Sequence, residues 1–510
     1  MFPFRFDFLD NKKYDREFSF YRDSNISERL DIQKLYDVLA EPKSESKWKY
    51  INFNLKKVLK NKELKYYNEF AYFYDYAREA LYNLSKKKDK NFFTDELSYY
   101  FEHKDYNGED KKDNIYQIET KDKLYELDID GVSLRIFTTG VAVLSIELYN
   151  RKYPELKDIK AINEYGRRFY PPFLKKDKDN KAKSISIVKK GDKSNNENKK
   201  SKVIEDCENL AVSKNEIRID EHLMKLLGVK FTQKLNDKEK FFIQPILDDR
   251  MFVMCWYGDD EFSKSLVDEK YVNNDEWYQY VFVDNGEKTV FSQKMQEQII
   301  KDATYDRWMD YKWGLTLFGV SRYSFVCLTG NNDFGRDTIR IHIETMYFQM
   351  MILLLANRAS ILRFSDEIAA VANSKNLNRL QPLYEKYLTF YNRLYFKEVT
   401  HQEQGIELYD TARKQMRIDE HMEKLDNKFS KLFEYADLKE NNETNDYMNK
   451  LTVMGAVFLP PSIMIALFSM GIFDYNKSWV SLGVGLFATF LSGVLGYKAI
   501  KLFRKNNEKD

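Results

Sequence analysis

Cysteine is scarce in this sequence, and neither sign of charge predominates. The three cysteines, Cys207, Cys255 and Cys327, have no C-x-x-C spacing, which is typical of reduced cytosolic thiols. Lysine and arginine number 82 against 80 aspartates and glutamates, so the overall charge indicates no class of partner. The stretch Met1–Asp10 has no apolar core, and we expect no signal peptide there.

Sequence signatures of catalysis are also missing. The sequence contains no Walker loop, no H-E-x-x-H and no G-x-S-x-G, and no pair of carboxylates is marked by its spacing as an acid/base couple. The five histidines are scattered, and a packed or solvated role is favoured over metal ligation for His421. We therefore predict that the protein is not an enzyme, and we assign no metal ligands.

Two long uncharged runs occur near the end of the chain. Residues 451–473 carry no charge over 23 positions, enough for a helix rising about 1.5 Å per residue to cross a hydrocarbon core about 30 Å thick. A second run covers 478–497, and a basic tail follows at 498–510. Basic segments favour the cytoplasmic side. The sequence therefore predicts a multi-pass protein of the cell inner membrane, with two spans and both termini in the cytoplasm.

The stretch before the first span has a helical repeat. From Ile418 onward, apolar residues recur at alternating steps of four and three, at Met422, Leu425, Phe429, Leu432 and Ala436. This spacing is typical of the seam of a coiled coil or of a tightly packed ring of helices. We predict a helical stalk over 418–450 that continues into the span.

The rest of the chain is predicted to contain an α/β domain. We expect a peripheral helical layer over 1–119, the α/β domain over 120–334 and long helices over 335–417. Within the domain, residues 175–202 hold 11 lysines against four acidic residues, and we expect a disordered loop there. The predicted fold class is an α/β cytoplasmic domain, a long helical stalk and two C-terminal transmembrane helices.

Local patterns give the expected elements of these regions. Strands are expected at 124–130, 132–139 and 141–150, with turns at Asp130-Gly131 and Gly140, and also at 241–246, 251–257, 278–284 and as a pair within 314–328. Helices are expected at 158–169, 338–373 and 376–416, the last two joined by a turn near Ser374-Lys375.

The membrane hairpin carries a family resemblance. The run KLTVMGAVFLPPSIMIALFSMGIF, after a stalk and before a second span, resembles the CorA family of magnesium channels. The resemblance implies a homo-oligomer, most simply a pentamer, in which the stalk helices continue into a pore. In the family a Gly-Met-Asn motif closes the outer mouth, whereas here the corresponding residues are Ser469, Met470 and Gly471. The amide that would contact a hydrated cation is missing, so bound Mg²⁺ and magnesium selectivity stay open.

Helical spacing back from the outer mouth predicts which residues line the pore. The face contains small, hydroxyl and apolar side chains, at Met448, Thr452, Gly455, Leu459, Ser462, Ala466 and Met470. Such a face suits a narrow lumen, although small residues also pack helices against each other in lipid. An acidic ring at the cytoplasmic mouth is predicted from Asp437, Glu440, Glu443 and Asp446. The alternative for these four is a solvated helix face.

Two arginine and aromatic patches in the α/β domain are candidates for ligand binding. One contains Arg167 and Arg168, and the other contains Trp308, Arg322 and Tyr323. Guanidinium groups beside aromatic rings suit a base and a phosphate, while core packing is the alternative. In these patches, and in its large domain, the chain is similar to the CorA-like membrane effectors of type III CRISPR defence. That resemblance implies a small nucleotide ligand, such as a cyclic oligoadenylate or an S-adenosylmethionine–AMP conjugate, and no direct contact with nucleic acid.

Three classes of function remain open at this point. The first is an ion channel gated by a nucleotide second messenger in antiviral defence. The second is a divalent metal cation transporter of the CorA type, for magnesium. The third is a membrane-anchored scaffold without a pore. The replaced Gly-Met-Asn motif argues against the second class, and the small and polar face of the first span argues against the third.

Overall fold

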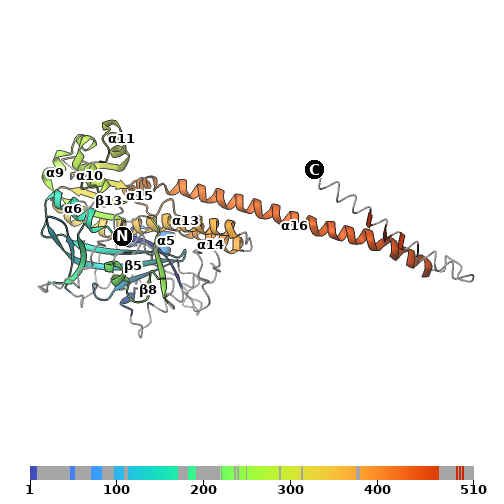
Figure 1. Cartoon of the computed structure of the whole chain (residues 1–510). Helices are drawn as coiled ribbons and strands as arrows, with labels where there is room; N and C mark the ends of the chain where they lie inside the picture. The colour runs from blue at the N-terminus through green and yellow to red at the C-terminus, as the bar shows by residue number, and fades with distance from the viewer. Residues whose placement is uncertain are drawn as a thin grey trace, which may run out of the picture. The chain divides into compact units, whose positions relative to one another are not determined.

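The computed structural model describes residues 1–8, 39, 46–51, 70–82, 97–107, 113–169, 182–190, 219, 221–234, 237, 240–247, 250–286, 289–311, 314–374 and 379–469, with seven further positions between 487 and 498. The chain divides into two compact units, Met1–Lys428 and Phe429–Asp510. We call them unit 1 and unit 2 (Figure 1).

A large, mainly antiparallel sheet forms the first layer of unit 1. In the described part of the chain it has nine strands, with β2-β3-β5-β6-β1-β9-β8 as its main path and β4 pairing with β5 and β7. The strands are β1 (Phe2–Phe8), β2 (Trp48–Tyr50), β3 (Ser98–His103), β4 (Asn114–Glu119), β5 (Leu124–Phe137), β6 (Val141–Tyr149), β7 (Ser184–Lys189), β8 (Phe231–Thr232) and β9 (Phe241–Pro245). Helices α5 (Asp75–Tyr82), α6 (Leu156–Gly166) and α8 (Glu221–Leu227) lie beside it.

The predicted helical layer at 1–119 is wrong, because β1 lies inside the sheet between β6 and β9. Alternate residues of a strand point to opposite faces, so Phe2, Phe4 and Phe6 all enter the core. On the other face, Asp7 accepts a 2.8 Å hydrogen bond from buried Arg363. The N-terminal residues are therefore part of the packed domain, with Asp7 paired to Arg363.

One of the two predicted turns is wrong, because it falls inside the long strand β5. It pairs with β6 through Asp128 and Ile129 and again from Gly131 to Ile136, so the expected turn at Asp130-Gly131 is an irregularity within one strand. Gly131 allows a close approach there, because an added Cβ would lie 3.1 Å from the side chain of Asn107. The expected turn at Gly140 is confirmed, since this glycine has a φ of 78° between β5 and β6.

Part of the predicted disordered loop is also ordered. Within 175–202, β7 pairs antiparallel with β4, and Ser184, Ile185 and Ser186 are buried. The sequence SISIVK alternates polar and apolar residues, a strand signal hidden by the surrounding lysines. Residues 175–181 and 191–202 lie outside the described part of the chain.

A second, smaller sheet has the order β10-β13-β12-β11. Its strands are β10 (Val253–Gly258), β11 (Thr304–Trp308), β12 (Thr316–Ser321) and β13 (Ser324–Thr329), so the predictions at 251–257 and 314–328 are confirmed. It packs with α9 (Asp260–Ser265), η3 (Lys270–Asn273), α10 (Asp275–Phe282) and α11 (Gln293–Ala303).

The strand predicted at 278–284 is instead the helix α10. Asn274 caps its N-terminus by accepting from the Trp277 N–H. Trp277, Tyr280 and Val281 are buried at a spacing that places them on one helical face. The aromatic run resembles a strand, but its spacing also fits a helix, and packing against Gly319 of β12 selects the helix.

A nearly continuous helical segment lies against both sheets. It begins with a π-helical turn, η4 (Phe334–Ile339), continues through α12 (Arg340–His342) and a second π-helical turn, η5 (Ile343–Tyr347), and becomes α13 (Phe348–Ser374). Arg363 bonds to the carbonyl groups of Phe6 and Gly140, while Tyr347 packs against Phe318 and Phe325 of the second sheet. The helix expected at 338–373 is confirmed.

The helix expected at 376–416 is in fact two helices, α14 (Leu380–Arg393) and α15 (Glu403–Met416). Between them Val399 and Thr400 are fully buried, and Thr400 pairs with Phe73 in an isolated β-bridge. This tertiary contact breaks the helix.

Among the described residues, one helix is long and apolar enough to cross a membrane, as judged by length and composition alone. It is the segment Phe334–Asn373, which contains an apolar window of 18 residues with a mean hydropathy of 1.3. Because 72% of its apolar window is buried, it also has the character of a core helix in a soluble domain. The span predicted at 451–473 lies partly outside the described residues, and the span at 478–497 and the tail at 498–510 lie almost wholly outside them.

The stalk prediction corresponds to α16 (Ile418–Ser469), a single helix of 52 residues (Figure 1). It starts after Arg417, which ends α15 in a left-handed conformation with a φ of 53°. The predicted stripe is buried within one chain, at Ile418, Met422, Leu425, Phe429 and Leu432. A ring of such helices remains a prediction.

Candidate ligand cavity

Arg167 and Arg168 lie where α6 ends. Gly166 lets the helix approach the sheet closely, because an added Cβ would lie 2.8 Å from the side chain of Ile118. Only 4% of Arg167 is exposed, and its Nη2 donates to Glu164 at 2.7 Å and to the Val283 carbonyl at 2.9 Å. Arg168 donates to the second oxygen of Glu164 at 2.5 Å. The Glu164 carboxylate thus accepts hydrogen bonds from two guanidinium groups.

The structure brings most of the two predicted patches together. Arg168 forms an isolated β-bridge with Arg250, whose guanidinium carbon lies 5.9 Å from the centre of the Tyr323 ring. The guanidinium carbon of Arg358 also lies close to this ring, 5.7 Å from its centre. Arg358 also donates to the carbonyl of Arg322 at 3.1 Å. Patches far apart in the sequence are therefore neighbours.

Trp308 does not belong to this group. It ends β11 and packs against Tyr305 and Phe318, with ring centres 6.4 and 6.3 Å away. Its neighbour Arg307 is bound by Glu403 and Glu407 of α15 at 3.0 and 2.8 Å. For Trp308 the structure favours the packing role over ligand binding.

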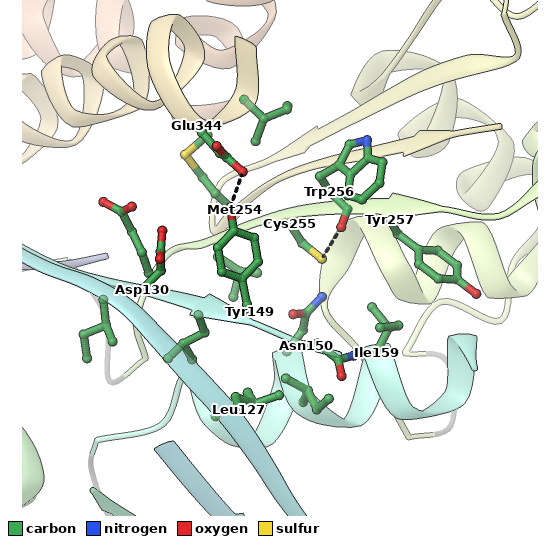
Figure 2. Close-up of a pocket in the computed structure, with 18 of the residues that line it drawn as sticks. Leu127, Asp130, Tyr149, Asn150, Ile159, Met254, Cys255, Trp256, Tyr257 and Glu344 are labelled. Carbon is green, nitrogen blue, oxygen red and sulfur yellow. Dashed lines mark hydrogen bonds between the residues drawn. The ribbon is translucent and has the colours of Figure 1, made fainter. Parts of the chain in front are cut away.

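A cavity of about 640 Å³ opens beside Arg167. Its walls come from β6, α6, β10 and the π-helical start of the long helix, and Figure 2 shows Tyr149, Met254, Cys255 and Glu344 around it. Aromatic side chains form much of the lining, at Tyr116, Tyr149, Tyr153, Phe252, Trp256, Tyr257 and Phe348. Pockets for small ligands are typically ~300–1,000 Å³ with a few convergent polar groups.

Buried polar atoms without partners mark one wall of this cavity. The Nε and Nη1 of Arg167, the Nδ2 of Asn163 and the Oγ of Ser145 are buried and have no hydrogen bond within the described residues. Leaving such a group unsatisfied costs roughly 1–3 kcal/mol, and more for a charged one. Burial lowers the pKa of Arg167, Glu164 opposes this, and Arg250 and Arg168 lower it further. An anion at this wall would satisfy the free donors and offset the positive charge.

A second polar group at the cavity comes from β6 and from the π-helical segment. The Tyr149 hydroxyl donates to Glu344 at 3.0 Å, as Figure 2 shows. Arg340 donates from one nitrogen to the Tyr149 oxygen at 3.0 Å and to Glu344 at 2.6 Å. These three residues, which we call the Tyr149–Arg340–Glu344 cluster, connect the large sheet to the π-helical turns.

The chemistry offered by the lining is that of binding. Cys255 also lines the cavity, but burial raises the pKa of its thiol, which disfavours the nucleophilic thiolate. In the described part of the chain no group of three or more His, Cys, Asp or Glu side chains is placed to hold a metal ion. Aromatic rings beside buried guanidinium donors instead suit a ligand with an aromatic base and an anionic group.

The predicted pore and ring residues lie along α16. Met448 is 58% exposed, and the Thr452 hydroxyl donates to its carbonyl at 2.8 Å. Gly455 follows on the same helix, while the side chains of Leu459, Ser462, Ala466 and Ser469 and all of Met470 and Gly471 lie outside the described part. Asp437, Glu440 and Asp446 are exposed, with Asp446 paired to Lys450 at 2.7 Å, and the side chain of Glu443 is not described.

Sequence reasoning identified Arg167 but missed Tyr149, Trp256, Arg340 and Glu344. The spacing of these residues in the sequence does not indicate a common site, because the cavity joins segments roughly a hundred residues apart. Their proximity depends on how the long helix lies against both sheets. Comparisons of the chain with protein-family models, curated proteins and solved structures found no match.

Proposed function

We propose that this protein is a CorA-like oligomeric membrane ion channel, gated by a nucleotide second messenger that binds unit 1, and an effector of type III CRISPR antiviral defence. The observation that carries the ligand part is the buried, partly unsatisfied guanidinium of Arg167 in the wall of a cavity of about 640 Å³. The aromatic lining supports a nucleotide in particular. An S-adenosylmethionine–AMP conjugate and a cyclic oligoadenylate are the candidate ligands.

The membrane part of the proposal is supported by the uncharged runs and by α16. Past Leu432, most of the large apolar side chains of unit 2 that the structure describes are exposed, with Leu451 at 63% and Phe490 at 70%. Lipid or other subunits would cover them. In this proposal the stalk helices assemble as a homopentamer in the inner membrane, with both termini in the cytoplasm.

Binding and ion flux test the proposal together. Full-length protein in detergent is titrated calorimetrically with the two nucleotide classes, and the same protein in liposomes is assayed for ion flux. We expect Arg167→Gln to weaken nucleotide binding by about ten- to a hundred-fold, since a charged hydrogen bond contributes roughly 1.5–3 kcal/mol. Arg307→Gln is the control, because Arg307 is exposed and pairs with Glu403 and Glu407, and none of these three residues lines the cavity.

The outcomes separate the three classes of function. Nucleotide-dependent flux that is lost in Arg167→Gln but kept in Arg307→Gln supports the proposal. Flux controlled by magnesium alone, without nucleotide binding, favours the transporter. A protein that conducts nothing and is monomeric by mass measurement in mild detergent favours the scaffold.

A further inference from the structure

The second polar group of the cavity suggests how occupancy is sensed. Arg340 lines the cavity and is 30% exposed, and its guanidinium is held by Glu344 and Tyr149. An anionic group entering the cavity would compete with Glu344 for the same donor. Bidentate guanidinium contacts with carboxylates and phosphates have similar geometry, so the exchange needs no new site.

Arg340 also occupies a special place in the helix. It begins the three-residue α12, between the π-helical turns η4 and η5. Single π-helical turns are rare and are frequently found at functional sites. Up to Arg336 the segment is largely exposed, while from Ile343 onward most residues are buried. The exposed residues up to Arg336 are therefore less constrained by core packing than the residues from Ile343 onward.

We propose that Arg340 is a second ligand-contacting residue, and that its exchange of Glu344 for an anionic ligand group rearranges the π-helical segment Phe334–Tyr347. This inference rests on the proposed function. In the empty cavity the Tyr149–Arg340–Glu344 cluster holds the segment in its π-helical form. In the occupied cavity Arg340 turns to the ligand, and the segment carries the change to α13.

The direction in which one substitution changes the Kd for the nucleotide distinguishes this role of Arg340 from a structural one. Glu344→Gln removes the charge that competes for Arg340, so we expect the Kd for the nucleotide to fall by about ten-fold. A cluster that merely supports the cavity predicts weaker binding for the same variant. Arg340→Gln should raise the Kd by about ten-fold or more.

The chain offers a matched control. Glu407 is also bound by a tyrosine and an arginine, Tyr305 and Arg307, but it does not line the cavity. Glu407→Gln should leave the Kd unchanged. If Glu407→Gln tightened binding as much as Glu344→Gln, the effect would be one of general charge and the proposal would fail.

Amide hydrogen exchange measures the proposed rearrangement of Phe334–Tyr347 directly. In the full-length wild-type protein, amides of Phe334–Tyr347 should change their exchange rate when nucleotide is added. In Glu344→Gln without nucleotide, they should already exchange as in the occupied wild type.

The two proposals fail in different ways. If no nucleotide binds the wild-type protein, the proposed function fails and this inference fails with it. If nucleotide binds the wild type, but Glu344→Gln binds it equally or more weakly, only the role of Arg340 is overturned.

Discussion

The two units of this chain differ in how far their large apolar side chains are buried. In unit 1 large residues such as Trp48, Trp277 and Tyr409 are at most 1% exposed. In unit 2, past the buried Phe429 and Leu432, several large apolar residues are exposed, with Tyr447 at 66% and Leu451 at 63%. Unit 1 therefore buries a core of its own, whereas the described part of unit 2 past Leu432 leaves much of its apolar surface exposed.

The two units also differ in the burial of their charged residues. Arg363 of unit 1 is 4% exposed and is fully engaged, with Asp7 and Glu367 each 2.8 Å away. Burying an ion pair is costly unless its geometry is good and further hydrogen bonds complete it. In unit 2 most of the described charged residues before Leu451 are exposed instead, and residues 451–473 then carry no charge. This order is the one expected where a stalk leaves water.

The largest expected effect comes from separating the units. A chain ending at Glu440 keeps the buried stripe of α16 and removes both predicted spans. We expect this chain to fold and to remain in the supernatant after ultracentrifugation of a cell lysate, while the full chain sediments with membranes. The comparison would break if the shortened chain also stayed with membranes, or if the full chain needed no detergent for extraction.

A smaller effect is expected where the buried stripe passes into unit 2. Phe429 is 2% exposed, whereas Lys431 is exposed on the same helix. Phe429→Asp should lower the free energy of unfolding of the chain ending at Glu440 by about 3–5 kcal/mol, the range for losing a large buried aromatic side chain. Lys431→Asp should change it by no more than about 0.5 kcal/mol. Urea denaturation gives both values, and equal effects would show that the stripe is not a packed face.

Periodic elements were predicted well from the sequence. The start of α16 and its buried stripe were predicted from one repeat of apolar residues. The strands β12 and β13 were predicted from two neighbouring apolar runs. The failures share a cause, since packing decided between two local choices. The aromatic run at Tyr278 fits a helix or a strand, and the glycine at 131 fits a turn or a bulge. In each case a neighbour distant in sequence made the selection.

The site was predicted only in part, for a related reason. Arg167 stood out because a guanidinium pair beside aromatic residues is visible in a short stretch. Arg340 and Tyr149 are 191 residues apart, and only the path of the long helix brings their side chains together. Trp308 satisfied the same local pattern as Arg167, but the structure gives it aromatic partners away from the cavity.

The smallest expected effect concerns pH, and it should act on unit 1. All five histidines of the chain lie before Phe429. Burial lowers the pKa of His342 below its ordinary 6.5, between the rings of Tyr72 and Tyr347. Burial also lowers the pKa of His421, and the nearby charge of Arg358 adds to this.

The sign of the pH effect follows from these shifts. Below about pH 6.5 the unfolded chain takes up protons on these histidines while the folded chain resists them, so acid favours unfolding. The chain ending at Glu440 should therefore lose stability between about pH 7.5 and about pH 5.5. His342→Gln should lose less over the same interval, because one of the two groups no longer titrates. Urea denaturation at both pH values measures the difference, and parallel losses in the two proteins would show that the burial of His342 is not responsible.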